Sequence, residues 1–248
     1  MKEIDKWKLE EKLGIKGWNF DHLDNRWFNE PLPWSYLKLV LKYLKPNMQL
    51  LDMGTGGGEL LKKFNHPAKN TQVTEAWEPN IKLLKQTLAI EGVRVIENEH
   101  EADIPVADNS LDMITNSHAA FDAELVKQKL KQNGLFITQQ VGALNNYSLS
   151  RYLDHNYQIV YPDNTLFNTV MTFEKLGFEI IYFAEYRPVM KFFDVGAIVY
   201  YASVIPWEFP DFSVENNLCE LQNLAKIIHQ FGSISTNEDR FIMIARKK

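Results

Sequence analysis

The sequence of 248 residues contains one cysteine, Cys219. A lone cysteine cannot form an internal disulfide, and it cannot supply a zinc or iron–sulfur site built from several cysteines. We therefore predict a chain without a disulfide framework and without a bound metal. Such a composition is compatible with a reducing compartment.

Long hydrophobic runs are also absent. The N-terminal stretch MKEIDKWKLEEK is charged throughout and has no apolar core of the kind that a secretion signal requires. The longest apolar run, at residues 195–205, has about half of the ~20 residues that a membrane-spanning helix needs. We therefore predict a soluble, cytoplasmic protein with no membrane partner.

Positive charge is in short supply, because 27 lysines and arginines stand against 32 aspartates and glutamates, which gives a net charge of −5. An acidic average disfavours a large polyanion as partner, although a local basic patch is compatible with it. No segment rich in lysine and arginine with interleaved aromatics indicates an appended RNA-binding module. A nucleic-acid partner is therefore disfavoured, though the sequence leaves it open.

What the sequence does contain, from about residue 48 onward, is an alternation of apolar β-type runs with helical patterns. Strands are predicted at residues 48–53, 72–74, 94–97, 111–116 and 135–141, with helices between them at 58–64, 79–90 and 122–131. A further helix at 164–176 and strands at 178–185 and 240–245 follow. Such alternation indicates βαβ units and an α/β fold with a parallel sheet and helices on both faces.

Three segments lie outside this alternation. Residues 1–45 contain four tryptophans (Trp7, Trp18, Trp27 and Trp34), residues 142–165 are polar, and residues 187–238 contain the stretch FFDVGAIVYYASVIPWEFPDF. We predict a helical N-terminal cover at 1–45 and a main domain at 46–248 with insertions at about 142–165 and 187–238. We expect the helical N-terminal and C-terminal segments to cover the strand ends, where open α/β sheets bind ligands.

A run of glycines follows the first predicted strand. The stretch LLDMGTGGGEL places Gly54, Gly56 and Gly58 between that strand and a helix. Glycines at such a turn let the backbone bend sharply and approach a ligand, and a helix N-terminus offers unpaired N–H groups. Glu75 follows about 20 residues on, at the end of the second strand, where an acid can accept hydrogen bonds from ribose hydroxyls. The pattern predicts a nucleotide-like ligand.

The spacing of the glycines distinguishes between two classes of nucleotide-binding site. The G-x-G-x-x-G fingerprint of dinucleotide sites fails, because Glu59 stands where the third glycine is needed. The pattern D-x-G-x-G-x-G fits, with Asp52 followed by Gly54, Gly56 and Gly58. This pattern resembles the first motif of the class I S-adenosylmethionine-dependent methyltransferases. The resemblance implies a Rossmann-like, seven-stranded, mostly parallel sheet and S-adenosyl-L-methionine as cofactor.

The resemblance also implies roles for single residues of the glycine loop and the second strand. Asp52 is expected to orient the amino group of the methionine moiety. The loop with Thr55 is expected to pass under the cofactor. Glu75, with Ala76 beside it, is expected to bind the ribose hydroxyls.

The stretch ADIPVADNSLD at residues 102–112 resembles the family's segment before its fourth strand. In the family an Asp a few residues earlier binds the adenine amino group, and His100 occupies that position here, with Glu101 and Ala102 beside it. This departure leaves His100, Glu101 or a backbone N–H for the adenine contact. Asn116 and Ser117, at the end of the fourth strand, match the place where the family positions its substrate and closes over the cofactor. The stretches PLPW, QQVG and FFDVGAIVYY resemble an uncharacterised bacterial methyltransferase group.

His118 is the best candidate for a general base, because it follows the fourth strand at its ligand-facing end. A structural histidine bonded to a neighbouring loop is the alternative. Asp122 would either pair with His118 or cap the helix that follows, and the cap is favoured. A base is needed only where the acceptor carries a proton that must leave early.

The leading interpretation is a methyltransferase that transfers a methyl group to a small-molecule acceptor by in-line displacement. One alternative is an RNA or protein methyltransferase, which would need a basic or peptide-shaped groove near the strand ends. Another alternative is a non-catalytic module that binds S-adenosylmethionine.

Overall fold

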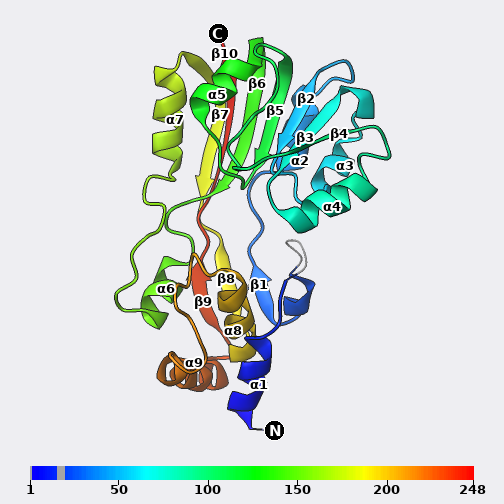
Figure 1. Cartoon of the computed structure of the whole chain (residues 1–248). Helices are drawn as coiled ribbons and strands as arrows, with labels where there is room; N and C mark the ends of the chain where they lie inside the picture. Colours follow the sequence, from blue (N-terminus) through cyan, green and yellow to red (C-terminus); the bar gives the residue numbers. More distant parts are fainter. Residues whose placement is uncertain (1, 16–19) are drawn as a thin grey trace. The chain divides into compact units, whose positions relative to one another are not determined.

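The computed structural model of the chain describes residues 2–15 and 20–248 (Figure 1). Trp18, one of the four tryptophans of the N-terminal segment, lies outside the described residues. The chain divides into two compact units. Residues 33–141, 164–185 and 241–248 form one, which we call the sheet unit. Residues 1–32, 142–163 and 186–240 form the other, which we call the insert unit.

The sheet unit contains a seven-stranded sheet with the spatial order β4-β3-β2-β5-β6-β10-β7. Its strands are β2 (Leu50–Met53), β3 (Thr71–Glu75), β4 (Arg94–Glu97), β5 (Leu111–Ser117), β6 (Leu130–Val141), β7 (Phe178–Tyr186) and β10 (Arg240–Lys247). β2 pairs in parallel with β3 on one side and with β5 on the other. The order of the strands therefore reverses beside β2, and ligands of open α/β sheets bind at such a point.

Helices cover both faces of this sheet. They are α2 (Tyr36–Tyr43), α3 (Glu59–Phe64), α4 (Glu78–Gln86), α5 (Ala123–Lys129) and α7 (Leu166–Lys175). Alternate residues of β2 face opposite sides, so Leu50 packs in a core with α2, α3 and α4, while Leu51 packs in a second core with α5 and α7. The predicted Rossmann-like sheet with helices on both faces is confirmed.

Several helices end a few residues before the end that the sequence predicts. The helix predicted at 79–90 ends at Gln86, and a turn through Gly92 leads from there to β4. The helix predicted at 122–131 ends at Lys129, because Leu130 already pairs with Leu111 as the first residue of β6. Asp122 caps this helix by accepting from the backbone N–H groups of Glu124 and Leu125. The predicted cap is therefore confirmed.

The insert unit is built from short elements of three distant segments. Its elements are α1 (Glu3–Glu10), η1 (Asp21–Leu23), β1 (Trp27–Asn29), α6 (Tyr147–Leu153), β8 (Val189–Phe192), α8 (Val195–Val204), α9 (Leu218–Phe231) and β9 (Ile234–Asn237). β1, β8 and β9 form a three-stranded antiparallel sheet. The segments expected to be helical covers thus contain strands as well, and α2, predicted as part of the N-terminal cover, belongs to the sheet unit.

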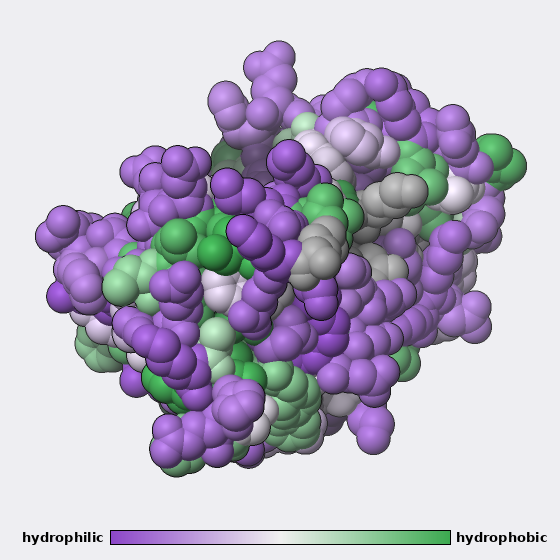
Figure 2. Space-filling view, turned by 90° about the horizontal axis from the view of Figure 1, so that it is seen from below, coloured by the Kyte–Doolittle hydropathy of each residue, from purple (hydrophilic) through white to green (hydrophobic). Residues whose placement is uncertain are grey.

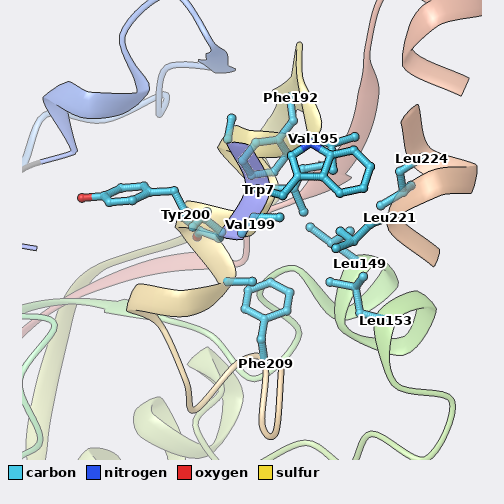
Figure 3. Packing of buried hydrophobic residues seen from close by; sticks show 14 of the residues in the cluster. Trp7, Leu149, Leu153, Phe192, Val195, Val199, Tyr200, Phe209, Leu221 and Leu224 are labelled. Atoms are coloured by element: carbon cyan, nitrogen blue, oxygen red, sulfur yellow. The ribbon is translucent and has the colours of Figure 1, made fainter. Parts of the chain in front are cut away.

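A single hydrophobic cluster holds the insert unit together (Figure 3). α8 is apolar on all sides and lies at its centre, where Val195 and Val199 pack among Trp7 of α1 and Leu221 and Leu224 of α9. The N-cap of α8 is Asp194, which accepts from the backbone N–H of Ala197 and forms a two-point ion pair with Arg26. Arg26 therefore links the chain before β1 to the start of α8.

Side chains on the face drawn in Figure 2 are mainly hydrophilic, and hydrophobic ones gather there in separate groups. Among residues 2–15 and 20–248 no helix is long and apolar enough to cross a membrane. The expectation that the outlying segments cover the strand ends stays a prediction.

Candidate functional site

The glycine loop follows the carboxyl end of β2. Gly54 and Gly56 have φ angles of +58° and +62°, a backbone region that side chains with a Cβ adopt at a cost. A Cβ on Gly54 would stand 2.4 Å from the Cβ of Ala119, so this glycine is needed for packing. A Cβ on Gly56 would meet no atom within 4 Å. Gly56 therefore faces open space, as a cradle for a ligand must.

The loop is tied to the neighbouring strand β3. The backbone N–H of Thr55 donates to the carbonyl of Thr74 (3.2 Å), and the N–H of Gly56 donates to Glu75 Oε2 (2.8 Å). Gly58 is the N-cap of α3 and is buried against Leu88. Gly56 and Glu75, which lie 19 residues apart and are both expected to bind the cofactor, are thus in direct contact.

Glu75 is buried, with 7% of its surface exposed, and its carboxylate accepts several hydrogen bonds. Oε1 accepts from the backbone N–H groups of Ala76 (3.0 Å) and Trp77 (2.9 Å). Oε2 accepts from Gly56 and, at 3.4 Å, from the side chain of Asn80. A carboxylate offers about four acceptor positions. A ribose hydroxyl would therefore take the place of the long Asn80 bond, and the ribose role of Glu75 stays a prediction.

Asp52 is a buried carboxylate at the end of β2. Burial raises its pKa from the ordinary value to about 6, and hydrogen bonds, including one from Thr115, oppose this rise. Thr115 Oγ1 donates to Asp52 Oδ1 at 2.6 Å from the neighbouring strand β5. A bound cation beside this carboxylate would stabilise its ionised form.

The loop after β4 holds the residues considered for adenine. His100 and Glu101 are exposed, Ala102 is half-buried, and Glu101 Oε2 accepts from the backbone N–H of Ala120 (3.2 Å). Sequence reasoning missed Asn98, which directly follows β4 and is buried. Its Nδ2 donates to the carbonyl of Asp103 (2.7 Å), while its Oδ1 has no hydrogen-bond partner among the described residues.

At the carboxyl end of β5 the side chain of Asn116 is fully buried. Its Oδ1 accepts from Gln140 Nε2 (2.7 Å) and Thr138 Oγ1 (3.3 Å), both on β6. These two bonds fix the orientation of the amide. Ser117 Oγ accepts from Gln139 Nε2 (2.8 Å). Asn116 pairs with Met53, the last residue of β2, so Asn116 and Ser117 lie next to the glycine loop that follows β2.

His118 follows β5 with an exposed side chain and a left-handed backbone (φ +72°). Its backbone N–H donates to the carbonyl of Gln139 (2.9 Å). Asp122 serves as the cap of α5, so its cap oxygen is already engaged. The role of His118 as a general base stays a prediction.

Tyr36 is a further residue that the sequence did not single out. It is buried, and its hydroxyl accepts from the backbone N–H of Asn116 (3.0 Å). The same hydroxyl lies within donating distance of the carbonyls of Asn116 (3.0 Å) and Ile137 (3.1 Å). Burial raises its pKa well above the usual range. Tyr36 thereby fastens α2 to β5 and β6 beside the site.

Comparison with protein families gives one match. Residues 51–138 match a family described as a methyltransferase domain. This region begins in β2 and ends in β6, so it contains the glycine loop, Glu75, Asn98 and Asn116. A comparison with curated proteins gave no match.

Solved structures share the fold at low sequence identity. A candidate methyltransferase from Bacillus halodurans C-125 is 19% identical over 85% of this chain and 98% of that one, with a TM-score of 0.57. A candidate sarcosine dimethylglycine methyltransferase from Galdieria sulphuraria is 18% identical over 85% and 82%, with a TM-score of 0.50. A SAM-dependent methyltransferase from Aquifex aeolicus is 13% identical over 100% of both chains, with a TM-score of 0.50. The family match and the shared fold agree on the same class of domain.

Proposed function

We propose that this chain, which carries an S-adenosylmethionine-dependent methyltransferase domain, transfers a methyl group to a small-molecule acceptor. The conformation of the loop at Gly56 is the main support for this proposal. Its backbone is held by Glu75 while the space where a Cβ would stand is empty. The bound cofactor supplies a methyl group on a sulfonium sulfur, which is already an activated leaving group.

The residues around the loop fit such a cofactor. Glu75 offers acceptors to the ribose, and Asp52 offers a buried carboxylate to the positively charged methionine portion. The unpartnered Oδ1 of Asn98 accepts from the adenine amino group, in the place where the family pattern has an Asp near His100. Trp77 is 46% exposed and lies two residues after Glu75, where its ring can stack on the purine.

The chemical step needs little beyond positioning. Because the leaving group is activated, the protein has to hold the acceptor in line and keep water out. The network of Asn116, Thr138 and Gln140 makes the ends of β5 and β6 rigid, which suits that task. His118 takes a proton from the acceptor where the acceptor has one to lose.

Two observations support a small acceptor. The fold is shared with a protein described as acting on sarcosine and dimethylglycine, which are small amines. The mean charge of the chain is negative, so it gives no general attraction for a polyanion. An RNA acceptor is the second candidate, and the exposed lysines of α2 and α3 favour it.

Transfer of a radioactive methyl group tests the proposal. The purified protein is incubated with methyl-tritiated S-adenosylmethionine and, separately, with the small-molecule, RNA and protein fractions of a bacterial extract. We expect label in the small-molecule fraction, and none with a Gly56→Val variant that has kept its fold. Label in the RNA or protein fraction instead would replace the acceptor class. Cofactor binding without label in any fraction would indicate a non-catalytic module.

A further inference from the structure

The sheet unit carries a concentration of positive charge on α2, α3 and the short helix η2 (Ala68–Asn70). Six exposed lysines lie on or beside these elements, and we call them the lysine surface: Lys38, Lys42, Lys45, Lys62, Lys63 and Lys69. The three elements contain a single acidic residue, Glu59. In a chain with a net charge of −5, this is a local reversal of sign, and it creates a positive potential at this surface.

The elements that bear these lysines are fixed next to one another. α2 packs beside α3, and Val40 and Leu61 share one hydrophobic core. Asn70 Nδ2 donates to the carbonyl of Pro46 at 2.8 Å. Lys45 precedes Pro46, and Lys69 and Asn70 belong to η2, so these two lysines lie on neighbouring parts of the chain. The three elements that bear the lysine surface are therefore adjacent.

Among the described residues none of the six lysines forms an ion pair, whereas Lys82 and Lys85 of α4 pair with Glu78 (3.2 Å) and Glu97 (2.6 Å). Lys42 lies over the ring of Tyr43, with its Nζ 5.3 Å from the ring centroid. The positive potential is thus available to a partner in solution.

The lysine surface is elongated and begins near the candidate site. Tyr36, the first residue of α2, is bonded to Asn116 at the carboxyl end of β5, and Lys38 follows two residues later. Lys45 and Lys69 precede β2 and β3, so they lie at the opposite, amino ends of the strands. The eight residues of α2 span about 12 Å. Lys38, Lys42 and Lys45 therefore form a row that leads along α2 from the carboxyl edge of the sheet.

We propose that the lysine surface binds the phosphate backbone of a single-stranded nucleic acid. A row of compact ammonium charges matches a chain of phosphates, which lysine contacts as a point charge without reading sequence. A membrane surface fits less well, because α2 and α3 expose one large hydrophobic side chain, Leu41, and offer little to insert. A protein interface fits less well for the same reason, since its centre is usually apolar. Binding at this surface requires neither the cofactor nor methyl transfer, so the inference goes beyond the proposed function.

Fluorescence anisotropy with a labelled oligouridine, without cofactor, tests the inference. The affinity is measured across a series of salt concentrations for the wild type, for a combined Lys38→Gln, Lys42→Gln and Lys45→Gln variant, and for a control variant. The control combines Lys82→Gln, Lys85→Gln and Lys175→Gln, which changes the net charge equally at exposed positions outside the lysine surface. Circular dichroism establishes that all three proteins are folded.

We expect the wild type to bind with an affinity that falls steeply with salt. Each phosphate contact on a single strand contributes about −0.7 to the slope of log K against log salt, so loss of three contacts makes this negative slope shallower by about 2. At about 0.1 M salt the lysine variant should bind at least about tenfold more weakly than the wild type. The control variant should bind like the wild type. Equal loss in both variants, no binding by the wild type at low salt, or binding to anionic vesicles but not to oligouridine would each overturn the inference.

Discussion

At the scale of single residues, two glycines of one loop serve different purposes: Gly54 allows close packing, and Gly56 leaves space for a ligand. Gly54→Ala would place a Cβ 2.4 Å from the Cβ of Ala119, so we expect loss of stability, seen as a lower urea midpoint.

The new Cβ of Gly56→Ala would stand in open space, so the fold should persist at a cost of about 1–2 kcal/mol for the left-handed backbone. Its Cβ would occupy the room for the ligand, and S-adenosylmethionine should bind at least about tenfold more weakly, a loss of about 1.4 kcal/mol. Unchanged affinity in Gly56→Ala would show that the cofactor lies elsewhere.

Asp52 should make the stability of the fold depend on pH. Its folded pKa of about 6 lies above the ordinary value, so the folded state holds a proton that the unfolded state has released between about pH 4 and pH 6. The wild type therefore loses stability as the pH rises through this window, by up to about 3 kcal/mol. Asp52→Asn keeps an acceptor for Thr115 and removes the buried charge.

We therefore expect Asp52→Asn to match the wild type near pH 4 and to exceed it in free energy of unfolding at pH 7.5. Urea titrations at both pH values measure this difference. The same variant should bind S-adenosylmethionine more weakly at pH 7.5, because the carboxylate no longer faces the cationic methionine portion. A stability difference that is the same at both pH values would contradict a raised pKa for Asp52.

Spacing along the chain predicted some site residues and missed others for a physical reason. Gly56 and Glu75 belong to one βαβ unit, whose geometry brings them together whenever that unit forms, and the structure shows a hydrogen bond between them. Thr115 reaches Asp52 across 63 residues, and the hydroxyl of Tyr36 reaches Asn116 across 80. Such contacts depend on which strands become neighbours. The sequence does contain one signal for such a contact, which is a polar residue within an apolar strand, as Thr115 is in LDMITNS.

At the scale of elements, the hydroxyl of Tyr36 joins α2 to the ends of β5 and β6. Tyr36→Phe would leave the buried backbone N–H of Asn116 without its partner, so we expect a loss of about 1–3 kcal/mol in the free energy of unfolding. Tyr43→Phe, on the same helix, is a matched control, because its hydroxyl has no hydrogen bond to a described residue. Urea denaturation of both variants measures the effect. Equal stability of the two variants would mean that the Tyr36 bonds contribute nothing net.

Elements also differ in how far sequence predicts them. The strands β2, β5 and β10 of the sheet unit are buried over most of their length, and all seven predicted strands of this unit are confirmed with shifts of a few residues. The strands of the insert unit have three or four residues each, and β1 finds its partner β8 about 160 residues away. These strands form because they pair with distant segments and pack on the core around α8, and a local sequence pattern does not reveal either interaction.

At the scale of the whole molecule, average composition hides the distribution of charge. The net charge of −5 disfavoured a polyanion partner and left room for a local basic patch, and six lysines that form no ion pair with a described residue lie on or beside α2, α3 and η2. Three segments that break the βαβ alternation assemble into one unit with its own core and its own sheet. Sequence located these segments approximately, because they lack the alternation, and it did not predict that they would combine.

The central claim is that the loop at Gly56, with Asp52 and Glu75, holds S-adenosylmethionine. Calorimetric titration of the purified protein with S-adenosylmethionine, S-adenosylhomocysteine and NAD tests it most directly. We expect binding of the first two at micromolar concentration, weaker binding of both to Gly56→Ala, and no binding of NAD. Binding of NAD, or failure of both adenosyl compounds to bind the folded wild type, would contradict it.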